Sequence, residues 1–208
     1  MKLVLDKYRD LKEIPLIPDG VTELYLSMNN LTTLQNYSLP DSIKILYLSF
    51  NKFEKIPILP PYLEELYINM NNISILENLP KTLKKLYCNY NKLTTIDRDN
   101  LPPNLEILDC ADNRISSIVS LPESLTFLDC SVNELRMLPN LPVNLQEFYC
   151  SYNKWRKHYI TGLLLKQTIT RHKKRMLTIR KELISKVFHP SRVEKYVEIY
   201  GLDWDEYV

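Results

Sequence analysis

Four cysteines are the residues of this 208-residue chain with the widest chemical range, since thiols bind metal ions, form disulfides and act as nucleophiles. They are spaced 22, 20 and 20 residues apart: Cys88, Cys110, Cys130 and Cys150. Zinc ligands are instead usually paired within about two to four residues. We therefore interpret these thiols as small apolar core side chains, with a zinc site or disulfides as the alternatives. Four unpaired thiols also favour a reducing, intracellular compartment.

Three aspartates provide the other candidate chemistry, because grouped carboxylates bind cations or transfer protons. Asp109, Asp112 and Asp129 occupy repeat-related positions, where we expect them to face solvent. No serine or cysteine has the sequence context of a catalytic nucleophile, and three dispersed glycines cannot form a phosphate-binding loop. We expect no catalytic residue, no metal and no cofactor, and hence no enzymatic activity.

Both sets of residues belong to an internal repeat that predicts the fold. Seven segments of the form Leu/Phe-x-Leu/Ile/Cys-x-x-Asn end at asparagines spaced 22, 20, 20, 22, 20 and 20 residues apart: Asn29, Asn51, Asn71, Asn91, Asn113, Asn133 and Asn153. Apolar residues precede and follow each segment at fixed offsets. This is the leucine-rich repeat pattern, in which each repeat contributes one strand to a solenoid.

The repeat length and composition predict the remaining architecture. Each asparagine follows a strand, so Asn51, Asn71, Asn91, Asn113 and Asn133 should form a buried polar ladder that satisfies backbone groups. The return segments are short and proline-rich, which predicts an extended or 3-10 convex side. We expect an α/β repeat solenoid, a leucine-rich-repeat horseshoe with a curved parallel sheet. Its predicted parts are an N-terminal segment with a partial repeat (1–20), the solenoid (21–155) and a helical C-terminal cap (156–208).

The repeat form L-x-x-L-P-x-L-P-x-x-L-x-x-L, over roughly residues 11–155, resembles the short leucine-rich repeats of secreted bacterial effectors. The richness in Tyr, Asn, Lys and Ile, together with the segment Phe188–Arg192, is also similar to repeat proteins of giant DNA viruses. Some of these effectors append a ubiquitin ligase with a catalytic cysteine. No cysteine follows Cys150, so the resemblance implies at most a ubiquitin-pathway adaptor.

The outward strand positions are rich in aromatic side chains, which favours a protein-recognition face. On this concave face we expect two columns of partner-binding residues, interrupted by an acidic notch: Tyr25, Tyr47, Phe50, Tyr67, Met70, Tyr87, Tyr90, Asp109, Asp112, Asp129, Tyr149 and Tyr152. Met28 and Val132 complete the second column. The alternative is that repeat duplication copied the aromatic residues without a binding role. The leading hypothesis is a non-enzymatic scaffold that binds a protein partner.

The C-terminal segment differs in charge from the repeats. Residues 154–208 carry 13 Lys and Arg against 6 Asp and Glu, a net charge of +7, whereas residues 1–153 carry 14 against 19, a net charge of −5. A helical apolar stripe from Leu165 to Val187 predicts a cap over the end of the solenoid. The second hypothesis is nucleic-acid or anionic-surface binding through the basic face: Lys166, Arg171, Lys173, Lys174, Arg175, Arg180 and Lys181. No apolar run is long enough to span a membrane, and we expect no signal peptide.

Overall fold

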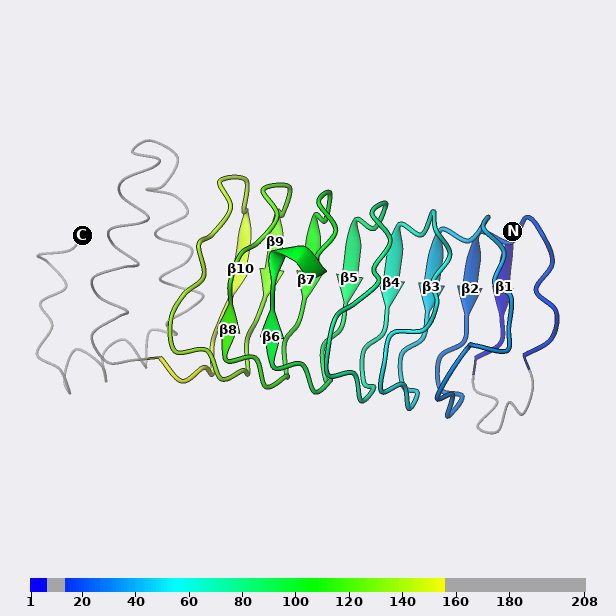
Figure 1. The fold of residues 1–208 in the computed structure, drawn as a ribbon, viewed down its shortest axis with the longest axis horizontal. Coiled ribbons are helices and arrows are strands. Elements are labelled where there is room, and N and C mark those ends of the chain that lie inside the picture. Colours follow the sequence, from blue (N-terminus) through cyan, green and yellow to red (C-terminus); the bar gives the residue numbers. More distant parts are fainter. Residues whose placement is uncertain (7–13, 156–208) are drawn as a thin grey trace, which may run out of the picture.

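A computed structural model describes residues 1–6 and 14–155, which form a parallel solenoid of about seven turns (Figure 1). The helical cap predicted for residues 156–208 lies outside the described residues. Every repeat contributes one short strand to a single parallel sheet, in the order β1-β2-β3-β4-β5-β7-β9-β10. The strands are β1 (Lys2–Val4), β2 (Glu23–Tyr25), β3 (Ile45–Tyr47), β4 (Glu65–Tyr67), β5 (Lys85–Tyr87), β7 (Ile107–Asp109), β9 (Phe127–Asp129) and β10 (Glu147–Tyr149). The leucine-rich-repeat architecture expected from the asparagine spacing is therefore present.

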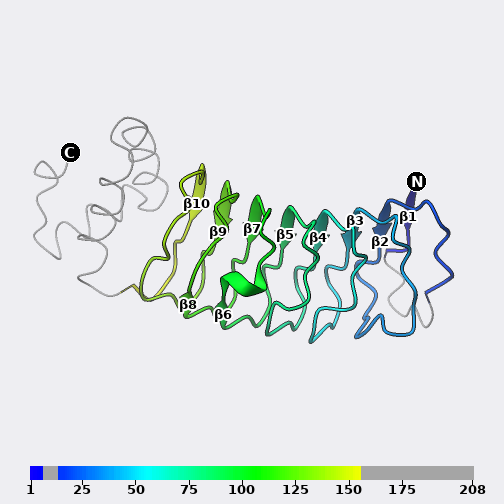
Figure 2. The same ribbon diagram turned by 45° about the horizontal axis from the view of Figure 1, so that its top comes forward.

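Equivalent residues of successive repeats are paired in register. Leu46 pairs with Leu24 on one side and with Leu66 on the other, and Tyr47 pairs with Tyr25 and Tyr67. The alternation of a strand then places the leucine inward and the tyrosine outward in every repeat. Figure 2 shows the strands along the inner side of a shallow arc, so the outward strand side chains form the concave face.

The return segments run along the opposite side of the solenoid, away from the eight-stranded sheet (Figure 2). They contain a pair of two-residue strands, β6 (Thr95–Ile96) and β8 (Ser117–Ile118), and the 3-10 helix η1 (Arg98–Asn100). Among the described residues no α-helix occurs. This matches the extended or 3-10 convex side that the prolines predict.

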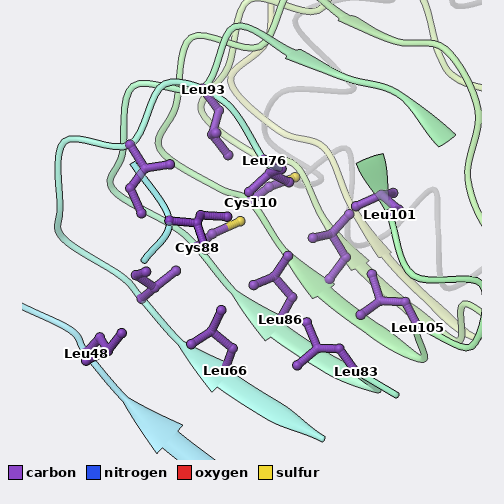
Figure 3. Close-up of a cluster of buried hydrophobic side chains, with 14 of the residues drawn as sticks. Leu48, Leu66, Leu76, Leu83, Leu86, Cys88, Leu93, Leu101, Leu105 and Cys110 are labelled. Atoms are coloured by element: carbon purple, nitrogen blue, oxygen red, sulfur yellow. The ribbon is translucent and has the colours of Figure 1, made fainter. Parts of the chain in front are cut away.

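The core is one continuous column of apolar side chains. Inward strand residues such as Leu66, Leu86 and Cys88 are completely buried. Figure 3 shows that Cys88 and Cys110 lie within this column, among leucines of successive repeats. Because every repeat buries its inward face against the next, the outward face is positioned by a stack that no single repeat could form alone.

The first strand of the sheet, β1, precedes the seven repeats found in the sequence. Leu3 pairs with Leu24, and the backbone N–H of Leu5 donates to the carbonyl of Tyr25 at 2.8 Å. The triplet Leu3-Val4-Leu5 has the Leu-x-Leu form of later strands, but no asparagine follows it at the repeat offset. In the sequence alone this triplet therefore falls in the N-terminal segment (1–20), outside the seven repeats. Within the described ranges no helix is long and apolar enough to cross a membrane.

Candidate partner-binding face

Four tyrosines on successive strands stack ring against ring along the concave face. The ring centroids are 4.1 Å apart for Tyr25 and Tyr47, 4.3 Å for Tyr47 and Tyr67, and 4.6 Å for Tyr67 and Tyr87. These distances are shorter than the strand spacing of about 4.8 Å. The rings therefore converge, as expected on the inner side of a curved sheet. We call these four residues the tyrosine ladder.

Stacking covers much of the ring surface in the ladder. The four tyrosines are half-buried, and burial raises the pKa of Tyr47 to about 12. Burial also raises the pKa of Tyr67 well above its ordinary value. The Tyr67 hydroxyl donates a hydrogen bond to the Glu65 carboxylate at 3.0 Å, and this contact raises the pKa further. The phenols of Tyr47 and Tyr67 therefore stay neutral at physiological pH.

A second row of large side chains is much more exposed, and its backbone conformation is unusual. The residue before each repeat asparagine has a positive φ, between 50° and 61°: Met28, Phe50, Met70, Tyr90, Asp112, Val132 and Tyr152. Left-handed conformations are uncommon for large side chains and most unfavourable for β-branched ones such as valine. The six members other than Asp112 expose 37–63% of their surface. We call these seven residues the left-handed row.

The asparagine ladder explains how the left-handed turn is held. In the fourth repeat, Nδ2 of Asn91 donates to the carbonyls of Cys88 and Asn89, at 3.0 and 3.2 Å, on the N-terminal side of Tyr90. It also donates to the carbonyl of Ile68 in the previous repeat at 3.0 Å. The buried ladder expected from the sequence is confirmed for Asn51, Asn71, Asn91 and Asn133, whereas Asn113 is half-buried but keeps the same bonds.

The predicted acidic notch interrupts the tyrosine ladder. Asp109 and Asp129 occupy the two register positions after Tyr87 and lie opposite each other on β7 and β9. Asp109 accepts from Nδ2 of Asn89 at 2.5 Å and from the backbone N–H of Ala111 at 3.2 Å. Burial raises the pKa of Asp109, the Ala111 N–H opposes this rise, and the carboxylate of Asp129 adds to it. The structure therefore brings two predicted site residues together, with Asp112 in the adjacent left-handed row.

Tyr149 and Tyr152 continue the two rows beyond this acidic notch. Tyr149 lies in register with Asp129, its hydroxyl donates to Glu147 at 3.1 Å, and its ring is 5.7 Å from that of Phe127. Tyr152 is the most exposed member of the left-handed row. Both lie on the face that the sequence assigned to them.

A further column of the concave face was not predicted from the sequence. It is formed by the first residues of the seven repeat strands β2, β3, β4, β5, β7, β9 and β10: Glu23, Ile45, Glu65, Lys85, Ile107, Phe127 and Glu147. These residues lie two positions before the tyrosine-ladder column, so strand alternation was the signal that would have revealed them. Their charges are partly paired, since Nζ of Lys85 lies 2.8 Å from Oε1 of Glu65.

The four cysteines are buried free thiols, which confirms the core interpretation. The Sγ atoms of Cys88 and Cys110 donate to the carbonyls of Asp109 and Asp129, each at 3.3 Å. Burial raises the pKa of all four thiols well above the ordinary value, and for Cys150 to about 12. Such thiols are poor nucleophiles. In the part of the chain that the structure describes, no group of three or more His, Cys, Asp or Glu is placed to hold a metal ion.

The basic residues of the second hypothesis lie outside the described residues: Lys166, Arg171, Lys173, Lys174, Arg175, Arg180 and Lys181. Nucleic-acid or anionic-surface binding through them stays a prediction, as does the intracellular location.

Comparisons with solved structures find bacterial relatives of this architecture. YopM from Yersinia enterocolitica WA-314 is 36% identical, covers 67% of this chain and has a TM-score of 0.61. YopM from Yersinia pestis, a leucine-rich effector protein, is 31% identical over 64% of this chain with a TM-score of 0.57. A Shigella effector leucine-rich repeat domain is 28% identical over 83% of this chain with a TM-score of 0.65.

This chain spans 30% and 43% of the two YopM chains and 77% of the Shigella domain. No protein-family model and no curated protein matches it. These three proteins come from bacteria, and the resemblance to giant-virus proteins stays a prediction. The shared fold, the identity and the repeat of about 20 residues agree: the chain is a leucine-rich repeat protein similar to the leucine-rich repeat domains of bacterial effectors.

Proposed function

We propose that this chain is a non-enzymatic scaffold that binds a protein partner on its concave face. The observation that carries the proposal is the left-handed row, in which large apolar side chains are both exposed and held at positive φ. Glycine or asparagine would fit this conformation at lower energy. Strained backbone that carries bulky exposed side chains is typical of functional surfaces.

The composition of the face supports a protein partner. Tyr, Phe and Met are enriched in the cores of protein interfaces, and contiguous exposed apolar surface marks interaction sites. Phe50, Met70 and Tyr90 lie on three adjacent repeats in the middle of the solenoid, where a ligand spanning the face must cover them. The tyrosine ladder beside them provides a rigid platform. The similarity to bacterial effector repeat domains also supports a scaffold rather than an enzyme.

Affinity capture from extracts of the native cell, followed by titration of the captured protein, tests the proposal. The variant Phe50→Ser with Tyr90→Ser removes two central side chains of the left-handed row and should weaken binding at least about 10-fold. The matched control is Ile58→Ser with Ile75→Ser, since these isoleucines are 77% and 57% exposed in the return segments. Equal affinity of the wild type and the Phe50/Tyr90 variant, with both folded by circular dichroism, would remove the concave face as the binding site.

A further inference from the structure

We infer that the partner presents an extended segment with a lysine or arginine whose charged group binds beside Tyr87, between Asp109 and Asp129. This inference rests on the proposed function and adds the chemistry of the partner. The two ends of the tyrosine ladder differ: a cation covers the ring of Tyr25, whereas the register neighbour beyond Tyr87 is Asp109.

At the N-terminal end of the ladder, a cation of the chain itself covers the outer ring. Nζ of Lys2 lies 4.1 Å from the ring centroid of Tyr25. A cation over the face of an aromatic ring is attracted by the negative charge of its π system. The first ring of the stack is therefore completed by an ammonium group on one side and by the ring of Tyr47 on the other.

At the C-terminal end the ladder stops at Tyr87 without such a cation. Tyr67 stacks on one side of Tyr87, and the register neighbour on the other side is Asp109. Among the described residues, the cation–π contacts involve only Tyr25 and Tyr62. The last ring is therefore followed in register by the carboxylate of Asp109 instead of a cation, and Asp129 follows on the next strand. A basic side chain placed over Asp109 would lie next to both the ring of Tyr87 and a carboxylate.

The carboxylates themselves lack a cationic partner in the part of the chain that is described. The ion pairs found there join Lys44 and Lys84 to Glu64, Lys85 to Glu65, and Lys154 to Glu134. Asp129 accepts from the backbone N–H of Ser131 at 2.9 Å, and Asp109 accepts from neutral donors only. Like charges on directly opposed strand residues destabilise a sheet. A cation from a partner would relieve that repulsion.

The shape of the face favours a long basic side chain at this place. Asp109 and Asp129 are shorter than the tyrosines on either side, and the residues two positions further on are the small Ala111, which is buried, and Ser131. The left-handed row beside them is one side chain wide and crosses all seven repeats. An extended polypeptide with apolar residues next to a lysine or arginine matches this linear arrangement, since its charge would lie over the aspartates and its apolar residues over Tyr90 and Val132.

Selection of random peptides displayed on phage against the full-length chain tests this inference, with synthetic peptides of the enriched sequence titrated afterwards. We expect enrichment of lysine or arginine flanked by apolar residues. The variant Asp109→Asn with Asp129→Asn should weaken binding of the basic peptide about 10- to 100-fold. It should leave a peptide with glutamine at the basic position unaffected. Glu54→Gln, an exposed carboxylate of a return segment, is the matched control and should change nothing.

The outcomes separate the inference from the proposed function. Peptides that need Phe50 and Tyr90 but show no basic residue, or that bind the Asn variant equally well, overturn the inference alone. If the selection yields no binding peptide, the inference that the partner presents an extended segment is overturned. The proposed function is then still decided by the capture experiment. Peptides indifferent to Phe50→Ser with Tyr90→Ser overturn both. The double variant Lys173→Glu with Lys174→Glu, made in the full chain, tests whether the chain's own basic segment occupies the face. If this variant binds the peptide more tightly than the wild type does, the basic segment is the occupant, and the inference of a separate partner is overturned.

Discussion

Oδ1 of Asn91 accepts a hydrogen bond from the backbone N–H of Ile73, one repeat earlier, at 3.0 Å. The same relation joins Asn71 to Phe53 at 3.0 Å and Asn133 to Ile115 at 2.8 Å. Each side-chain amide therefore connects two repeats and also holds the left-handed turn of its own repeat. The surface that carries the exposed apolar residues is coupled in this way to the buried polar ladder.

Replacing Asn91 by alanine should lower the free energy of unfolding by at least about 2 kcal/mol. The change leaves the Ile73 N–H and the carbonyls of Ile68 and Cys88 buried without this partner. Urea unfolding followed by circular dichroism measures the loss. Asn104→Ala is the control, because Asn104 is exposed on a return segment. Equal transitions for Asn91→Ala and wild type would show that the amide ladder does not support the fold.

Replacing Val132 by asparagine should stabilise the protein by about 0.5–1 kcal/mol, since Val132 has a φ of 53° that asparagine adopts more readily. The valine is 41% exposed, so little packing is lost. Thermal unfolding measures the change, and Val143→Asn is the control, at an exposed valine outside the left-handed row. A lower melting temperature for Val132→Asn than for wild type would mean that the valine makes stabilising contacts that outweigh its strain.

Tyr67 and Tyr90 both lie on the concave face, but their removal should have different effects on stability. Tyr67→Ala removes two ring stacks, at 4.3 and 4.6 Å, and should cost about 1–3 kcal/mol. Tyr90→Ala removes a side chain that is 51% exposed and should change stability by no more than about 0.5 kcal/mol. Chemical denaturation of the two variants separates the tyrosine ladder from the left-handed row. Indistinguishable losses would contradict this division.

Stability should fall as the pH rises above about 8.5, the ordinary pKa of a cysteine thiol. Burial raises the pKa of the four thiols in the fold, so above that pH the unfolded chain loses protons that the folded chain keeps. Below it, both states are protonated and the thiols contribute no pH dependence. The raised pKa of Tyr47, about 12, adds a loss of the same sign above about pH 10.

The variant Cys110→Val with Cys130→Val tests the origin of this pH dependence. Both slots are apolar and fully buried, and the equivalent slots hold Leu26, Leu48 and Ile68, so each change should cost less than about 1.5 kcal/mol at neutral pH. Urea unfolding between about pH 8 and pH 10 should then give a shallower loss of stability than in wild type. The same slope in both proteins would assign the dependence to other groups.

The sequence by itself was sufficient to predict the repeat, the residues that point inward and outward, and the burial of the thiols. Cys88, Leu86 and Asn91 recur at fixed offsets, and a strand period of two together with stacking determines which side each must occupy. The acidic notch was also predictable, because Asp109 and Asp129 stand where earlier repeats have tyrosine.

Only the tertiary structure decided how these residues meet. The stacking of Tyr67 on Tyr87 depends on the curvature of the sheet, and the cation of Lys2 over Tyr25 depends on β1 joining that sheet. The positive φ of Tyr90 and Val132 depends on a turn that hydrogen bonds from the following asparagine hold in place. Distances between neighbouring repeats and the handedness of a turn arise from packing, and a one-dimensional period contains neither.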